Sequence, residues 1–89
     1  MSTQQLTSGA WTPYAPLTSA DQTVFNEALQ GFVGVNYKPQ SVSTQTVAGT
    51  NYRFKCLSAL PGSDQGWESI VEIFKPLQGK PHITGIIRI

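Results

Sequence analysis

The residues that could carry catalytic chemistry are few, and their positions argue against an enzyme. The chain has one histidine, His82, beside a proline in an expected turn, and one cysteine, Cys56, within an expected strand. A nucleophile–histidine–acid set needs a histidine placed beside the nucleophile, and no pattern in the sequence places His82 there. A cysteine on the core face of a strand behaves as a small apolar side chain and is mostly unreactive. We therefore expect no catalytic residues and no enzyme activity.

A metal or cofactor site is not expected either. The five acidic residues are scattered, and none forms a spaced cluster with His82 or Cys56. A metal site needs three or four converging ligands. Gly31 and Gly34 fall at the end of an expected helix rather than at its start, so they do not form a phosphate-binding loop. The sequence therefore predicts neither metal nor cofactor.

Composition limits the partners of the chain. It has 89 residues, which is the size of one domain, with 39% apolar and only 12% charged residues and a net charge of +1. No basic run is present, so we expect no nucleic acid partner. No apolar stretch is long enough for a bilayer, and the polar first residues do not resemble a signal peptide. With a single cysteine, these features predict a cytoplasmic protein, with unconventional secretion left open.

The N-terminal part is expected to be non-helical. Residues 1–9 are polar and predict a flexible arm, followed by a single domain over residues 10–89. Pro13 and Pro16 lie in the segment 10–18, which we expect to be extended or turning because proline disfavours a helix there.

One helix follows this segment. Ser19 can cap its start, and Gln22, three residues later, can complete a capping box. Apolar residues then recur at helical spacing, which predicts a helix from Ala20 to Val33 with one buried stripe. Gly34 is the expected stop.

The remainder of the chain alternates with the period of strands. Within the second expected strand, Tyr52, Phe54 and Cys56 fall on one face. Because no helix separates the strands, they form an antiparallel meander whose apolar face the helix must cover. The predicted fold is α+β, with a single helix packed on a twisted antiparallel sheet of four to five strands. The expected strands are residues 41–48, 50–59, 67–75 and 83–89.

Two of the expected turns should lie close together. Successive turns of a meander fall at alternate ends of the sheet, so the turns at 48–50 and 76–81 share one end. The turn at 60–66 lies at the other end. The arm around Gly9 joins the first two if it runs along the sheet edge. These glycine-containing tips carry few charges and form a wedge, although each alone could be an ordinary hairpin turn.

Three segments in order give the chain a family resemblance. Gln45 to Gly49 match the Gln-x-Val-x-Gly loop of the cystatins, and Val47 to Tyr52 extend this match in the manner of stefins. The chain therefore resembles a cystatin, and more narrowly the stefin-like (type 1) group that lacks disulfides and a signal peptide. The other matching segments are the glycine arm with Gly9-Ala10-Trp11-Thr12-Pro13, the strand and loop Ile73-Phe74-Lys75-Pro76-Leu77-Gln78-Gly79, and the final strand with Ile83-Thr84-Gly85.

The resemblance implies a function and a set of contact residues. Cystatins are reversible, non-covalent, competitive inhibitors of papain-like cysteine proteases of the cathepsin type. They fill the active-site cleft with an N-terminal arm and two hairpin loops. The resemblance also implies a monomer that can exchange strands to form a domain-swapped dimer. The contacts carried over to this chain are Gly9 in the arm, Gln45, Thr46, Val47, Ala48 and Gly49 in the first hairpin, and Pro76, Leu77, Gln78, Gly79 and His82 in the second loop.

The chain departs from the family pattern in two places. Thr7 and Ser8 before Gly9 are small and polar, and Gln78-Gly79 stand where the family often has Pro-Gly or Pro-Trp. We therefore expect the first hairpin to carry more of the binding than usual. Two other interpretations stay open. One is a cystatin-like binding module that does not inhibit proteases, and the other is a merely structural domain.

Overall fold

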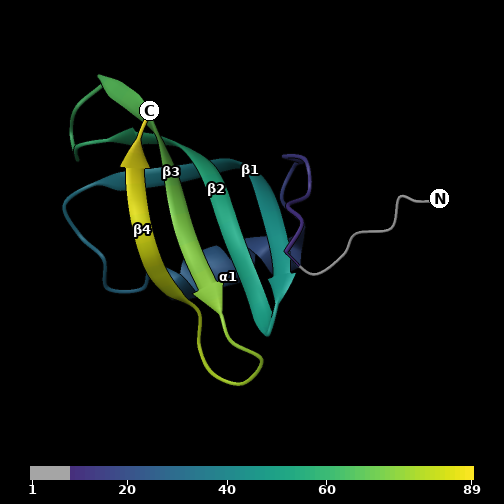
Figure 1. Cartoon of the computed structure of the whole chain (residues 1–89). Coiled ribbons are helices and arrows are strands. Elements are labelled where there is room, and N and C mark those ends of the chain that lie inside the picture. The colour runs from purple at the N-terminus through teal and green to yellow at the C-terminus, as the bar shows by residue number, and fades with distance from the viewer. Residues whose placement is uncertain (1–8) are drawn as a thin grey trace.

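The computed structural model describes residues 9–89 and shows one helix against one face of a four-stranded antiparallel sheet (Figure 1). Each strand pairs with its neighbour in sequence, in the order β1-β2-β3-β4. This arrangement confirms the expected α+β class and the meander, and it is compatible with the cystatin-like description. The elements are α1 (Ser19–Ala28), β1 (Asn36–Val47), β2 (Gly49–Ala59), β3 (Gly66–Lys75) and β4 (His82–Arg88).

The helix begins one residue earlier than predicted. Thr18 is the N-cap, with extended backbone at φ −81° and ψ 171°. Its hydroxyl accepts a hydrogen bond from the Asp21 backbone N–H at 3.1 Å, and the Asp21 carboxylate accepts one from the Thr18 N–H at 3.0 Å. The expected capping box of Ser19 and Gln22 is therefore wrong. The carboxylate of Asp21 is a stronger acceptor than an amide and also suits the positive end of the helix dipole.

The helix also ends earlier, at Ala28 rather than Val33. Gly31 has φ +81°, in the left-handed region that glycine adopts without a side-chain clash. The chain therefore turns away three residues before the predicted stop. Phe32, which falls within the predicted helix, therefore lies beyond α1. It is 43% exposed and packs its ring on Tyr37, with 5.8 Å between ring centroids.

Strand β1 is longer than predicted, because it begins at Asn36 rather than at residue 41. The pairing with β2 shifts between Pro39 and Ser41, which marks a bulge. Proline has no N–H to donate to a ladder, but it is tolerated on an edge strand such as β1. Because proline is unusual within a strand, the sequence pattern did not predict the part of β1 that precedes residue 41.

The core lies between α1 and the sheet. Phe54 on β2 is completely buried, and its ring meets Phe25 of the helix edge-to-face with centroids 4.9 Å apart. Cys56 is buried on the same face, and Tyr52 stacks on Phe54. The predicted alternation in this strand is thus confirmed. The buried apolar residues are Val24, Phe25, Val42, Phe54, Cys56, Val71 and Ile73.

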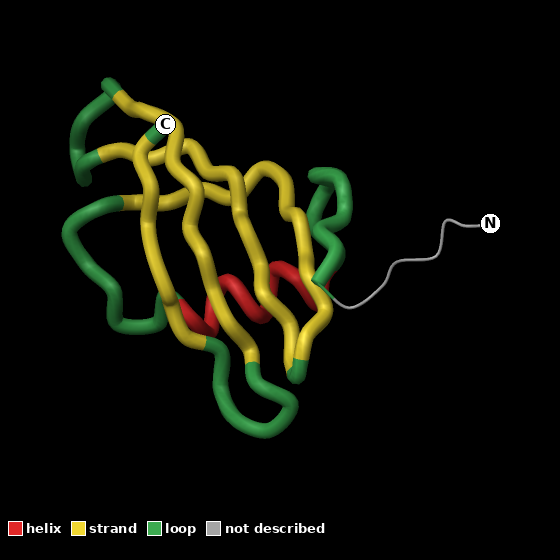
Figure 2. Tube along the Cα trace, viewed as in Figure 1, coloured by secondary structure: helices red, strands yellow, loops and turns green. Residues whose placement is uncertain are grey.

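The segment before the helix covers the outer edge of β1. Isolated antiparallel bridges join Trp11 to Gln45 and Ala15 to Val42. The Ala15 N–H donates to the Val42 carbonyl at 3.0 Å, and the Val42 N–H donates back at 2.9 Å. Figure 2 shows this segment as a loop running beside β1. The sheet has four strands, and the N-terminal segment adds these bridges along one edge.

Candidate functional site

The end of the sheet that carries the β1–β2 turn and the β3–β4 loop gathers the predicted contact segments (Figure 1). A row of hydrogen-bonded and paired residues crosses this end of the sheet. The Gly9 N–H donates to the Thr46 carbonyl at 3.1 Å, Thr46 pairs with Thr50, and Thr50 pairs with Lys75. Residues far apart in sequence therefore lie side by side. The prediction that both turns share one end is confirmed, and Gly9 lies beside the first of them. The rest of the predicted arm, residues 1–8, lies outside the described residues.

The first hairpin has a narrow tip. Val47 pairs with Gly49, so Ala48 alone forms the turn and is exposed. Gly49 is buried, with φ +114°. A Cβ added there would collide with the carbonyl oxygen of Lys75 and would lie 3.0 Å from the Cα of Pro76. Glycine is required at this position for two reasons, its backbone angle and its contact with the neighbouring loop.

The second loop, residues 76–81, starts where β3 ends. Pro81 is buried and anchors the loop, whereas Leu77 is 76% exposed. His82 belongs to β4 rather than to the turn predicted for it, and its ring packs edge-on against Phe74 with centroids 5.8 Å apart. Pairing of His82 with Phe74 extends the ladder by one residue beyond the predicted strand start. The loop thus exposes the apolar side chain of Leu77, while buried Pro81 holds its C-terminal end in place.

A residue that the sequence did not single out organises the first hairpin. Asn51 lies directly opposite Gln45 in the β1–β2 register. Its side-chain nitrogen donates to the Gln45 side-chain oxygen at 2.8 Å, and the Gln45 side-chain nitrogen donates to the Gly9 carbonyl at 2.8 Å. A hairpin tip at Ala48 sets this register, so the pairing could have been inferred from the sequence once the tip was known.

Trp11 fixes the segment that follows Gly9. The Arg53 guanidinium carbon lies 4.2 Å from the centroid of the Trp11 ring, and the Arg53 Nε donates to the Glu72 carboxylate at 3.1 Å. The ion pair is partly exposed, so its own contribution to stability is small. Its effect is to hold the guanidinium against the indole. A cation–π contact of this kind keeps the N-terminal segment on the sheet.

Charge is sparse at this end of the molecule. Residues 45–51 contain no ionisable side chain, and the second loop contributes the exposed Lys80. A surface of this kind loses little solvation energy when a partner covers it. The arrangement is suited to insertion into a cleft rather than to binding a charged ligand.

The Cys56 thiol lies in the core rather than at these tips. Burial raises the pKa of the Cys56 thiol to about 12, so the thiol keeps its proton at neutral pH. Among residues 9–89, no three side chains of the His, Cys, Asp and Glu types come together as a metal site. Helix α1 has ten residues. Within residues 9–89, no helix is long and apolar enough to cross a membrane.

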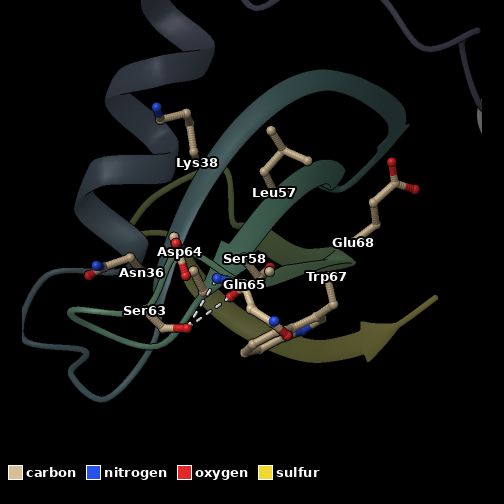
Figure 3. Close-up of a pocket in the computed structure, with 11 residues that line it drawn as sticks. Asn36, Lys38, Leu57, Ser58, Ser63, Asp64, Gln65, Trp67 and Glu68 are labelled. Carbon is tan, nitrogen blue, oxygen red and sulfur yellow. Dashed lines mark hydrogen bonds between the residues drawn. The ribbon is translucent and has the colours of Figure 1, made fainter.

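An open cleft of about 410 Å³ lies at the opposite end of the sheet (Figure 3). Its walls include Leu57, Gly66 and Trp67 from the strands and Ser63, Asp64 and Gln65 from the β2–β3 turn. The Ser63 hydroxyl donates to the Gln65 carbonyl and accepts from the Gln65 N–H, which shapes the turn. None of the predicted contact residues lines this cleft, so it is separate from the tips.

Comparison of the chain with protein-family models, with curated proteins and with solved structures found no match.

Proposed function

We propose that this chain is a reversible, non-covalent, competitive inhibitor of papain-like cysteine proteases, with cathepsin-type enzymes as its targets. In this proposal the chain is a stefin-like member of the cystatins and acts in the cytoplasm. The inhibitor inserts Gly9, the Gln45–Gly49 hairpin and the Pro76–His82 loop into the active-site cleft of the protease. It carries out no chemistry of its own.

One observation carries this proposal. Three segments chosen from the sequence for their resemblance to cystatin contacts lie next to one another at one end of the sheet. Gly9 is hydrogen-bonded to Thr46, and Gly49 packs against the backbone of Lys75 and Pro76. A four-stranded meander by itself brings the two turns to one end. It does not require the hydrogen bond that places Gly9 beside the first hairpin, or the close contact of Gly49 with the second loop, and these two contacts support the proposal.

The physical properties of the tips favour tight insertion. The first hairpin is uncharged and narrow, so its burial costs little desolvation. Both loops are tied to a sheet, and the N-terminal segment is hydrogen-bonded along β1, so little ordering is required on binding. Exposed Leu77 offers an apolar contact at the second loop. A standard interface of roughly 1,600 Å² with these properties supports affinities in the nanomolar range.

Inhibition without cleavage follows if the hairpin blocks the cleft while no peptide carbonyl reaches attack distance from the protease thiolate. The Cys56 thiol takes no part, because it is buried in the core of the inhibitor. The complex then dissociates to release intact inhibitor.

The proposal is tested by titrating active-site-quantified papain with the full chain. We expect stoichiometric, reversible loss of activity. Ala48→Arg should weaken inhibition by about a hundredfold, because it places a bulky, positively charged side chain at the exposed tip of the first hairpin, where binding would bury the charge in the protease cleft. Ala20→Arg, the same change at an exposed alanine on α1, should leave inhibition unchanged. Full papain activity at micromolar excess of inhibitor would reject the proposal.

The alternative is a binding module of the same fold without protease inhibition. Gln78-Gly79 in the second loop favours it, because this pair lacks the aromatic or proline group that the family often has there. The titration separates the two functions. Under the alternative, papain stays active at every ratio of the two proteins.

A further inference from the structure

We propose that Gln45 is a positioning residue, which holds Gly9 beside the first hairpin through a directional relay of side-chain hydrogen bonds from Asn51 to Gly9. The role of the relay in inhibition rests on the proposed function. The relay itself does not depend on that function, because its hydrogen bonds form in the free chain.

The direction of the relay is fixed by the group at its end. The Gly9 carbonyl can only accept a hydrogen bond, so the Gln45 side chain must turn its nitrogen toward it, at 2.8 Å. The Gln45 oxygen then faces β2, where it needs a donor. The Asn51 side-chain nitrogen supplies one at 2.8 Å. Asn51 therefore orients Gln45, and Gln45 holds Gly9.

The backbone makes Gly9 a natural anchor point. Its N–H donates to the Thr46 carbonyl at 3.1 Å, so the residue is held on both its donor and its acceptor. Gly9 also has φ +94°, which a residue with a side chain rarely adopts. Gly9 is therefore held directly beside the first hairpin.

A second set of contacts holds the segment that follows Gly9. Thr12 accepts from the Thr44 N–H with its hydroxyl at 2.9 Å, and its carbonyl accepts from the Ser43 hydroxyl. These contacts hold the segment on β1 without help from Gln45. Loss of the relay should therefore free the arm locally at Gly9 and leave the rest of the fold intact.

Gln45→Glu is the sharpest test. The variant keeps the shape of the side chain and still accepts from Asn51, but it cannot donate to the Gly9 carbonyl. We expect the hydrogen-exchange rate of the Gly9 amide, measured by NMR on the full chain, to rise about fivefold to tenfold, as for loss of one hydrogen bond. Amides in β2 and β3 should be unchanged. Gln30→Glu, which adds the same charge at an exposed glutamine beyond α1, is the matched control.

Asn51→Asp tests the direction of the relay. The new carboxylate can only accept, so it draws the Gln45 nitrogen toward itself and turns the Gln45 oxygen toward the Gly9 carbonyl. The Gly9 amide should then exchange faster, although Gln45 itself is unaltered. Unchanged Gly9 exchange in both variants, with both folded by circular dichroism, would overturn the proposal.

A double-mutant cycle in papain inhibition tests the functional part. Gly9→Pro removes the anchor, because proline has no N–H and cannot adopt φ +94°. If Gln45 acts through the arm, Gln45→Glu weakens inhibition of papain in the wild-type background but not in the Gly9→Pro background. Equal losses in both backgrounds would mean that Gln45 acts directly on the protease. If papain is not inhibited at all, the proposed function fails, and the exchange measurements still decide the relay.

Discussion

Gly49 lies against the backbone carbonyl of Lys75 so closely that no Cβ fits between them. This contact joins the first hairpin to the start of the second loop. It makes Gly49 part of the fold as well as part of the proposed binding surface. Loss of inhibition in a Gly49 variant would therefore report on both roles together.

Gly49→Ala should destabilise the protein by about 2–4 kcal/mol, since alanine is strained at φ +114° and its Cβ meets the Lys75 carbonyl. Urea unfolding would measure the loss. Gly62→Ala is the control, because Gly62 also has positive φ, at +79°, but has open space around it. Equal losses in the two variants would show that the contact with Lys75 contributes nothing.

Leu77→Ser should weaken papain inhibition by about tenfold, the effect expected when burial of one apolar side chain is lost from an interface. Leu77 is 76% exposed in the free chain, so its loss should leave the free energy of unfolding unchanged. Inhibition constants and urea midpoints measure the two effects. Leu60→Ser, a change at another exposed leucine in the β2–β3 turn, should alter neither. Inhibition that is unaffected by Leu77→Ser would exclude the second loop from the interface.

Thr18→Ala should cost about 1 kcal/mol of stability, because it removes the side-chain acceptor for the Asp21 N–H at the helix start. Ser19→Ala should cost much less, since the two hydrogen bonds of the capping box are made by Thr18 and Asp21. Thermal unfolding of the pair measures the difference. A larger loss of stability for Ser19→Ala than for Thr18→Ala would show that Ser19 is the N-cap, as the sequence predicted.

Phe54→Ala should destabilise the fold by about 3–5 kcal/mol, because Phe54 is fully buried and its ring contacts Phe25 and Tyr52. Leu60→Ala, at a 53% exposed position, should stay within about 0.5 kcal/mol of the wild type. Chemical denaturation compares the two. A small effect of Phe54→Ala would contradict the packing of α1 on this face of the sheet.

The stability of the protein should fall in alkali through Cys56. Burial raises the pKa of this thiol from about 9 to about 12, so the unfolded chain loses the proton before the folded chain does. Above pH 9 the unfolded state binds fewer protons. The free energy of unfolding therefore decreases as the pH rises from 9 toward 12, by up to about 1.4 kcal/mol per pH unit.

Urea unfolding between about pH 8 and pH 11 would measure this slope, with Cys56→Ala as the control. The variant should be less stable near neutrality but should lose less stability in alkali. Tyr52, whose pKa is also raised by burial, is present in both proteins and contributes equally to both slopes. Parallel slopes would show that Cys56 does not titrate differently in the two states.

Local pattern was sufficient for most of the architecture. The alternation around Phe54 predicted the core face of β2, and the order of turns predicted that Gly49 and the second loop would share one end. Both follow from rules that act over a few residues, namely the two-residue period of strands and the reversal of direction at each hairpin. The same rules predicted that the proposed contact segments would lie together.

Tertiary structure alone decided where elements end and which side chains meet. The sequence pattern predicted Gly34 as the stop, but the helix ends before Gly31, and Phe32 then packs on Tyr37. Pro39 weakened the strand pattern, yet pairing with β2 carried β1 through it. In the relay from Asn51 through Gln45 to Gly9, the hairpin tip predicts the pairing of Gln45 with Asn51, but the contact of Gln45 with Gly9 depends on how the N-terminal segment packs along β1. Contacts between distant residues depend on packing, which local propensity does not encode.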